Sequence, residues 1–219
     1  MPSRGKVWRS LMQVCGVALA LSLALTSGAQ AGGPTEEVRT LIDEVLRILQ
    51  HQPSQSPAQK RQRLELIEKT TARRINYGEM AKRSLGPTWN TLSRAQQEEF
   101  VHLFSELLKA SYASRLDEFA QARVVYQSEE NSEDCAEVRI LILRLNDRIP
   151  VNFSMLKEPQ GWMIYDLVIE GVSLVNNYRS QFSRIINGSS YQDLVRCLRT
   201  KLQAEAGCLR AQVKEDHKD

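Results

Sequence analysis

The side chains that could perform chemistry in this sequence are few and scattered. None of the three histidines, His51, His102 and His217, has a second potential metal ligand at a suitable spacing. The sequence also lacks a Gly-x-Ser-x-Gly elbow, a phosphate-binding loop and a Gly-x-Gly-x-x-Gly fingerprint. We therefore expect no metal, no cofactor and no nucleophilic hydrolase.

Asp166 is the carboxylate that the sequence places inside an apolar strand. A buried carboxylate beside a cavity could act as a general base. The alternative, which we favour, is a structural carboxylate that is hydrogen-bonded at the strand end and paired with Arg179. An enzyme that uses Asp166 remains open as a second hypothesis.

Three of the four cysteines, Cys135, Cys197 and Cys208, lie outside the N-terminal segment. Their number and spacing do not form a disulfide framework. Cys197 and Cys208 could pair if the chain turned between them at Gly207, and reduced thiols are the alternative.

The first 31 residues resemble a secretory signal peptide. Arg4, Lys6 and Arg9 precede an apolar run over residues 11–25, and Ala29-Gln30-Ala31 is a small-x-small cleavage signal. A membrane anchor is the alternative, but the apolar run is short for a span. The mature chain is expected to begin near Gly32 and to be exported and soluble.

Removal of residues 1–31 changes the charge balance. Three of the 29 basic residues and none of the 26 acidic residues lie in this segment, so the remainder carries 26 of each. A neutral chain offers no basic surface for nucleic acid, and no nucleic-acid partner is expected. We expect one domain over residues 32–206 and a charged tail over 207–219.

The stretch from Trp162 to Phe182 combines a strand and a helix. The strand is expected to be apolar on both faces, with alternation placing Trp162, Ile164, Asp166 and Val168 opposite Met163, Tyr165, Leu167 and Ile169. Gly171 breaks the strand, Ser173 can cap a helix, and the apolar period becomes helical from Leu174.

The other elements are predicted from the same periodicities. Helices are expected over about 36–50, 58–74, 77–85, 94–119, 174–186 and 191–204, with caps at Asn76 and Ser93. Strands are expected over 123–128, 135–145 and 148–156, followed by the strand from Trp162, with connections short enough for an antiparallel meander. The predicted class is α+β, with helices packed on a four-stranded antiparallel sheet.

Apolar side chains exceed what one packed interface needs. They could form an ordinary core or the wall of a cavity between sheet and helices, and composition alone does not decide. The stripes that could face one another predict a ligand-binding wall of Phe104, Leu108, Tyr112, Ile140, Ile142, Val151, Phe153, Leu174, Tyr178 and Phe182.

A set of motifs in fixed order resembles one known family. It consists of Tyr77-Gly78-Glu79-Met80-Ala81, Leu85-Gly86-x-x-Trp89, Phe100-x-x-Leu103-Phe104-x-x-Leu107-Leu108, Tyr112, Trp162-x-x-Tyr165-Asp166 and the run Glu170–Phe182. The chain resembles the MlaC family of periplasmic phospholipid-binding proteins, also called the toluene-tolerance auxiliary family. The chain departs from the family in the first motif. The family commonly has Phe-Asp before the Met-Ala pair, whereas here Tyr77 follows Asn76 and Gly78 intervenes.

The resemblance implies a lipid carrier. Such proteins have helices on a twisted antiparallel sheet, an NTF2- or cystatin-like cone, and hold phospholipid acyl chains in a cavity between sheet and helices. They move lipid in the periplasm between an outer-membrane lipoprotein–porin complex and an inner-membrane ABC transporter with an MCE-domain ring. The protein is expected to act as a monomer, and a protein-interaction module with a fully packed core is the remaining alternative.

Overall fold

The computed structural model describes residues 32–52, 54–113, 116–145 and 147–215, with side chains up to residue 204. These residues belong to one compact unit, Gly32–Asp219. None of the helices in the described ranges is long and apolar enough to cross a membrane. The expected signal peptide and the side chains of Cys208 and His217 lie outside the described residues.

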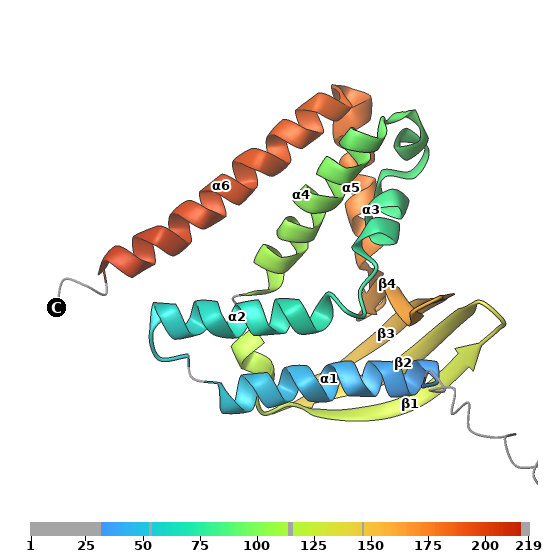
Figure 1. Ribbon diagram of the computed structural model, residues 1–219, viewed down its shortest axis with the longest axis vertical. Helices are drawn as coiled ribbons and strands as arrows, with labels where there is room; N and C mark the ends of the chain where they lie inside the picture. The colour runs from blue at the N-terminus through green and yellow to red at the C-terminus, as the bar shows by residue number, and fades with distance from the viewer. Residues whose placement is uncertain (1–31, 53, 114–115, 146, 216–219) are drawn as a thin grey trace, which may run out of the picture. The chain divides into compact units, whose positions relative to one another are not determined.

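The chain forms helices first, then strands, then helices (Figure 1). In order, the elements are α1 (Pro34–His51), α2 (Pro57–Thr71), α3 (Tyr77–Leu85), η1 (Gly86–Thr91), α4 (Arg94–Ala113), η2 (Leu116–Phe119), β1 (Arg123–Asn131), β2 (Cys135–Arg144), β3 (Asp147–Glu158), β4 (Gly161–Ile169), β5 (Val172–Ser173), α5 (Leu174–Gly188) and α6 (Tyr191–Glu215). The predicted α+β class with helices on an antiparallel sheet is confirmed.

The sheet is a meander in which each strand pairs with its sequence neighbours, in the order β1-β2-β3-β4-β5. All four pairings are antiparallel. The prediction of four strands was one short, because Val172 and Ser173 pair with the end of β4 before α5 begins. Glu170 and Gly171 make this tight turn with φ of 50° and 80°, which glycine adopts without steric cost.

Three predicted helix caps are confirmed. The Asn76 side chain accepts a hydrogen bond from the Glu79 N–H, and Ser173 accepts one from Asn176. Before α4, Ser93 and Gln96 each accept from the other's backbone N–H, which is a complete capping box. These bonds satisfy donors that a helix N-terminus would otherwise leave free.

Helices α1 and α2 lie side by side, with α1 along the sheet, and α3, α4, α5 and α6 form a separate group (Figure 1). This division produces two apolar cores. One lies between α1 and the sheet, and the other lies among the four helices.

Two predicted helix ends were wrong. The helix expected over 94–119 is α4, which ends at Ala113, and a separate turn of 3₁₀-helix, η2. The last helix does not end near Ala204 but continues through Gly207 to Glu215. At 1.5 Å per residue, about 16 Å of helix separates Cys197 from residue 208, too far for a disulfide. Cys197 is free and exposed.

The strand β4 contains a bulge that changes which side chains share a face. Its register with β3 shifts between Ser154–Asp166 and Met155–Ile164, which leaves Tyr165 as the extra residue. Trp162 and Ile164 therefore contact the same core as Leu167 and Ile169. The regular alternation predicted along this strand was wrong beyond Ile164.

Candidate functional site

The first candidate site for an apolar ligand is the core among the helices, which we call the helical cluster. It contains Met80, Ala81 and Leu85 of α3, Phe100, Leu103, Phe104, Leu107 and Leu108 of α4, Val175, Tyr178 and Phe182 of α5, and Tyr191, Leu194, Val195 and Leu198 of α6. Its centre is aromatic: the Phe104 ring lies 5.3 Å from that of Tyr178 and 5.8 Å from that of Phe182, edge to face in both pairs. Ring pairs at this distance hold side chains in definite positions without polar bonds.

The second candidate site is the core between α1 and the sheet, which we call the sheet cluster. It contains Val38, Leu41, Ala136, Val138, Ile140, Val151, Phe153, Met155, Trp162 and Ile164. Pairing places Ile140 opposite Val151 and Val138 opposite Phe153, so adjacent strands present one continuous apolar face to α1.

Nine of the ten predicted wall residues are divided between these two clusters, and Leu174 belongs to neither. Phe104, Leu108, Tyr178 and Phe182 belong to the helical cluster, with Tyr112 packed at its edge. Ile140, Val151 and Phe153 belong to the sheet cluster, with Ile142 packed at its edge. Leu174 is buried at the start of α5. The structure therefore divides the predicted wall into two groups, and each group packs within its own cluster.

The two clusters meet at Ile75 and Leu167, which contact both. We call this contact the cluster boundary. Ile75 lies between α2 and α3 and forms a parallel bridge with Ile164, in which the Ile164 N–H donates to Arg74 and the Asn76 N–H donates to Ile164, each at 2.8 Å. Sequence reasoning missed Ile75, because a single apolar residue in a linker carries no periodicity. It placed Leu167 on a strand but did not include it in the predicted wall.

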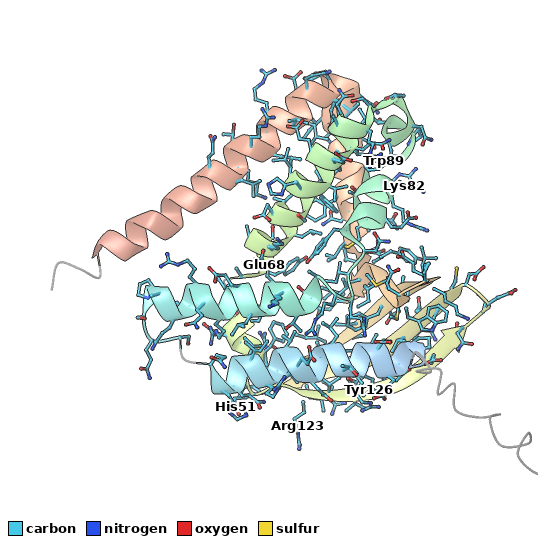
Figure 2. The ribbon with its side chains drawn as sticks, in the orientation of Figure 1. His51, Glu68, Lys82, Trp89, Arg123 and Tyr126 are labelled. Atoms are coloured by element: carbon cyan, nitrogen blue, oxygen red, sulfur yellow. The ribbon has the colours of Figure 1, made fainter. Side chains whose placement is uncertain are left out.

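Polar groups lie beside the helical cluster where α2 approaches α4. Lys109 of α4 forms ion pairs with Glu106, at 2.8 Å, and with Glu68 of α2, which is labelled in Figure 2. Burial raises the pKa of the nearby Tyr77 hydroxyl above its ordinary value. On the inner side, the Ser111 and Tyr178 hydroxyls lie 3.5 Å apart.

Asp166 has a structural role. Its carboxylate accepts hydrogen bonds from the Ser173 hydroxyl and, at 3.0 Å, from the Val175 N–H at the start of α5. The predicted pairing with Arg179 was wrong: the exposed Arg179 guanidinium instead lies against Gly86, 3.1 Å from where a Cβ would stand. Among the side chains that the structure describes, no group of three His, Cys, Asp or Glu could hold a metal ion.

These features define a helix-and-sheet protein that has two apolar cores and few polar groups suited to catalysis. The comparisons with known proteins agree with that class. A family model described as MlaC protein matches residues 39–200, and the chain belongs to the MlaC family.

Two individual proteins illustrate the similarity. The "Intermembrane phospholipid transport system binding protein MlaC" of Haemophilus influenzae (strain ATCC 51907 / DSM 11121 / KW20 / Rd) is 26% identical over 138 residues, which are 60% of this chain and 63% of that relative. The phospholipid-binding protein of Ralstonia solanacearum, solved in complex with a phospholipid, aligns with a TM-score of 0.70 at 22% identity. That alignment covers 78% of this chain and 97% of the solved chain, and it supports the fold.

Proposed function

We propose that this protein is a periplasmic phospholipid carrier that holds acyl chains between the helical cluster and the sheet cluster, at the cluster boundary. The observation that carries the proposal is the presence of two apolar cores that meet through partly buried residues such as Ile75 and Leu167. Membership of the MlaC family and the lipid-bound relative of the same fold support it.

The physical requirement for a carrier is severe. Two acyl chains carry about 30 methylene groups, and each gains roughly 0.8 kcal/mol on leaving water. Free diffusion of a phospholipid through water is therefore negligible. A protein interior can replace the bilayer only if it is dry and deformable. It must also bind the lipid about as strongly as the bilayer does, so that the lipid can leave again. Two cores that meet at a boundary of partly buried residues fit these conditions better than one continuous core.

The carrier is proposed to exchange lipid with membrane complexes on both sides of the periplasm. In the family these are an inner-membrane MCE-domain/ABC transporter complex and an outer-membrane lipoprotein–porin complex. The name of the Haemophilus influenzae relative assigns that relative to an intermembrane phospholipid transport system. Export through the N-terminal signal peptide, followed by cleavage near Gly32, would place this chain in the same compartment.

The alternative functions have less support. Asp166, the proposed base of an enzyme, has its carboxylate oxygens engaged by Ser173 and Val175, so it is not presented to a substrate. A protein-interaction module without ligand would have no need for two separate apolar cores.

The decisive experiment is native mass spectrometry of protein purified from cells without detergent. We expect a mass increase that corresponds to bound phospholipid, confirmed by extraction and lipid analysis. Protein that is folded and free of lipid would overturn the proposal.

Two wall substitutions locate the ligand. Leu108, 7% exposed in the helical cluster, and Val151, 4% exposed in the sheet cluster, would each carry an unpaired carboxylate into the acyl chains after substitution by Glu. We expect folded Leu108→Glu and Val151→Glu proteins without lipid, whereas Val172→Glu, at a 55% exposed site, should keep it. Lipid retained by both folded wall variants would place the ligand elsewhere.

A further inference from the structure

Leu145, in the turn between β2 and β3, combines an unusual backbone conformation with a fully exposed apolar side chain. Leu145 has a φ of 44°, in the left-handed region that favours Gly, Asn and Asp over a branched aliphatic residue. Its side chain is also fully exposed, at 102% of the reference area. A leucine in this place is unfavourable for the isolated fold, which suggests that it has another role.

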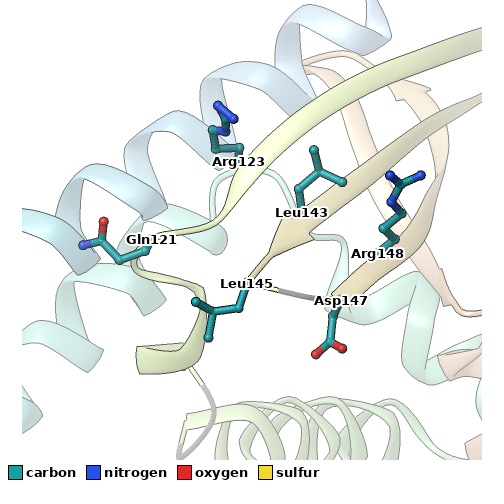
Figure 3. Close-up of a pocket in the computed structure, with 6 residues that line it drawn as sticks. All are labelled: Gln121, Arg123, Leu143, Leu145, Asp147 and Arg148. Atoms are coloured by element: carbon teal, nitrogen blue, oxygen red, sulfur yellow. The ribbon is translucent and has the colours of Figure 1, made fainter.

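Two arginines accompany Leu145. The strand register places Arg123 of β1 and Arg148 of β3 on either side of Leu143 of β2. Figure 3 shows these three side chains projecting to the same side from adjacent strands, whereas the Leu145 side chain projects from the turn in another direction. All four residues border one hollow. We call Arg123, Leu143, Leu145 and Arg148 the hairpin-tip surface.

The charges on this surface are available to a partner. The neighbouring acidic groups, Glu118 and Asp147, are both paired with Arg144. Arg123 and Arg148 are exposed and form no ion pair with any carboxylate of the described residues. Together with Gln121 and Asp147, the hairpin-tip surface borders a hollow of about 450 Å³, large enough for a phosphate-bearing headgroup.

We propose that the hairpin-tip surface docks this protein on the surface of an anionic phospholipid bilayer. Guanidinium groups bind phosphate oxygens in a bidentate manner, and a bilayer offers phosphates at every lateral position. A projecting leucine can enter the boundary between headgroups and acyl chains without a pocket of matching shape. The inference adds a membrane-docking site to the proposed carrier and does not depend on where the cargo lipid is held.

An acidic protein partner fits the surface less well. Stable protein interfaces bury about 800 Å² on each partner and have an apolar centre that matches a concave surface. Here the apolar part is two separate leucines, the exposed Leu145 at the turn and the half-buried Leu143 on the strand, and the rest is cationic. That pattern is typical of interfacial contact with lipid headgroups.

The test measures binding to vesicles by flotation. Protein is expressed from the full sequence, and all variants share the same N-terminus, so any contribution of the apolar N-terminal segment cancels. Vesicles of phosphatidylethanolamine with a minority of phosphatidylglycerol are compared with vesicles of phosphatidylcholine alone. We expect binding to the anionic vesicles, weaker binding to the neutral ones, and loss of binding as salt is raised.

Two variants and two matched controls assign the effect. Leu145→Asn should weaken binding about tenfold while keeping or raising the melting temperature, because Asn tolerates positive φ. Replacing both arginines, Arg123→Gln with Arg148→Gln, should weaken binding roughly 25-fold, about fivefold for each arginine near an anionic surface. The controls, Val172→Asn and Arg47→Gln with Arg184→Gln, change other exposed sites by the same chemistry and should bind like the unmodified protein.

Three outcomes would overturn the inference. These are no binding to anionic vesicles, equal binding by Leu145→Asn and Val172→Asn, and equal loss in the two double-arginine variants. Capture of an acidic protein without vesicle binding would assign the surface to that partner instead. Co-purified lipid is measured in the same preparations, so a failure of docking is distinguished from a failure of the proposed cargo binding.

Discussion

The carboxylate of Asp166 connects the end of the sheet to the start of a helix. It accepts from the Ser173 hydroxyl and from the Val175 N–H, and Ser173 itself caps α5 by accepting from Asn176. A negative charge at a helix N-terminus is also favoured by the helix dipole. One buried side chain therefore fixes the corner at which the chain leaves β4.

We predict that Asp166→Ala lowers the free energy of unfolding by about 2–3 kcal/mol, because it leaves the buried Val175 N–H without an acceptor. Chemical denaturation measures this change. The matched control is Ser154→Ala, on the half-buried residue paired with Asp166 in β3, which should change stability little. Equal losses in the two variants would mean that the carboxylate has no special role.

Tyr126 gives a prediction of pH dependence. Burial, followed by the nearby Asp43, raises the pKa of its hydroxyl to about 12, and that oxygen has no hydrogen-bond partner among the described residues. In the unfolded chain the Tyr126 hydroxyl ionises at about pH 10. Between pH 10 and 12 the unfolded chain therefore binds fewer protons than the folded protein, and the free energy of unfolding falls by about 1–2 kcal/mol. Tyr126→Phe should reduce this fall and leave stability at pH 7 unchanged or slightly higher.

Urea unfolding at a series of pH values tests the prediction. Tyr77 and Tyr191 also have a raised pKa through burial, so some loss should persist in Tyr126→Phe. Identical pH profiles for the two proteins would contradict the assignment to Tyr126.

At the scale of elements, the corner between α3 and η1 depends on a glycine. Gly86 has a φ of 58°, and a Cβ there would stand 3.1–3.3 Å from the guanidinium of Arg179 on α5. Any other residue would strain the backbone and push this side chain away. The Leu85-Gly86 pair, part of one of the motifs that resemble the family, therefore has a physical reason.

We predict that Gly86→Ala lowers the free energy of unfolding by about 2 kcal/mol, because alanine disfavours this backbone conformation. Gly188→Ala is the control: a Cβ there meets nothing within 4 Å, and alanine should stabilise α5 by roughly 0.5–1 kcal/mol. Thermal denaturation of both variants gives the comparison. A stable Gly86→Ala protein would show that this corner can rearrange.

Element types were predictable from the sequence where periodicity was strong. The α1 stripe, the capping box before α4 and the meander of β1 to β4 are all encoded in local patterns. The bulge at Tyr165 was not predictable, since an extra residue in a run apolar on both faces leaves no trace in the pattern. The same limit explains why Leu167 was assigned to the wrong face.

At the scale of the whole molecule, the residues of the predicted wall are buried or partly buried, but in two clusters and not in one continuous wall. Each stripe lies against apolar partners, as its spacing required, but the stripes of α4 and α5 face one another, and the strands face α1. Periodicity states which side of an element is buried and not which other element covers it. The assignment of these residues to a lipid remains a prediction.

Removal of lipid should therefore weaken the molecule as a whole. A ligand at 100 times its dissociation constant stabilises the folded state by about 2.7 kcal/mol, and delipidation removes that contribution. We expect a lower melting temperature and faster amide exchange at the cluster boundary, around Ile75 and Leu167. Leu108→Glu, proposed to lack lipid, should not respond to the same treatment. An unchanged melting temperature of the unmodified protein would argue against bound lipid.

The order of elements along the chain also sets the order in which the cores can form. Every strand pairs with a sequence neighbour, so the sheet consists of local contacts that close early. Helix α1 is different, because Val38 and Leu41 pack on Val138, Ile140 and other residues that lie about a hundred positions later. A chain that emerges from its amino end exposes the apolar side of α1 until β2 and β3 have emerged, and such a surface is prone to aggregation. Among the described elements, helix α1 is therefore a segment that a holding chaperone would protect, and it should acquire protection late during refolding.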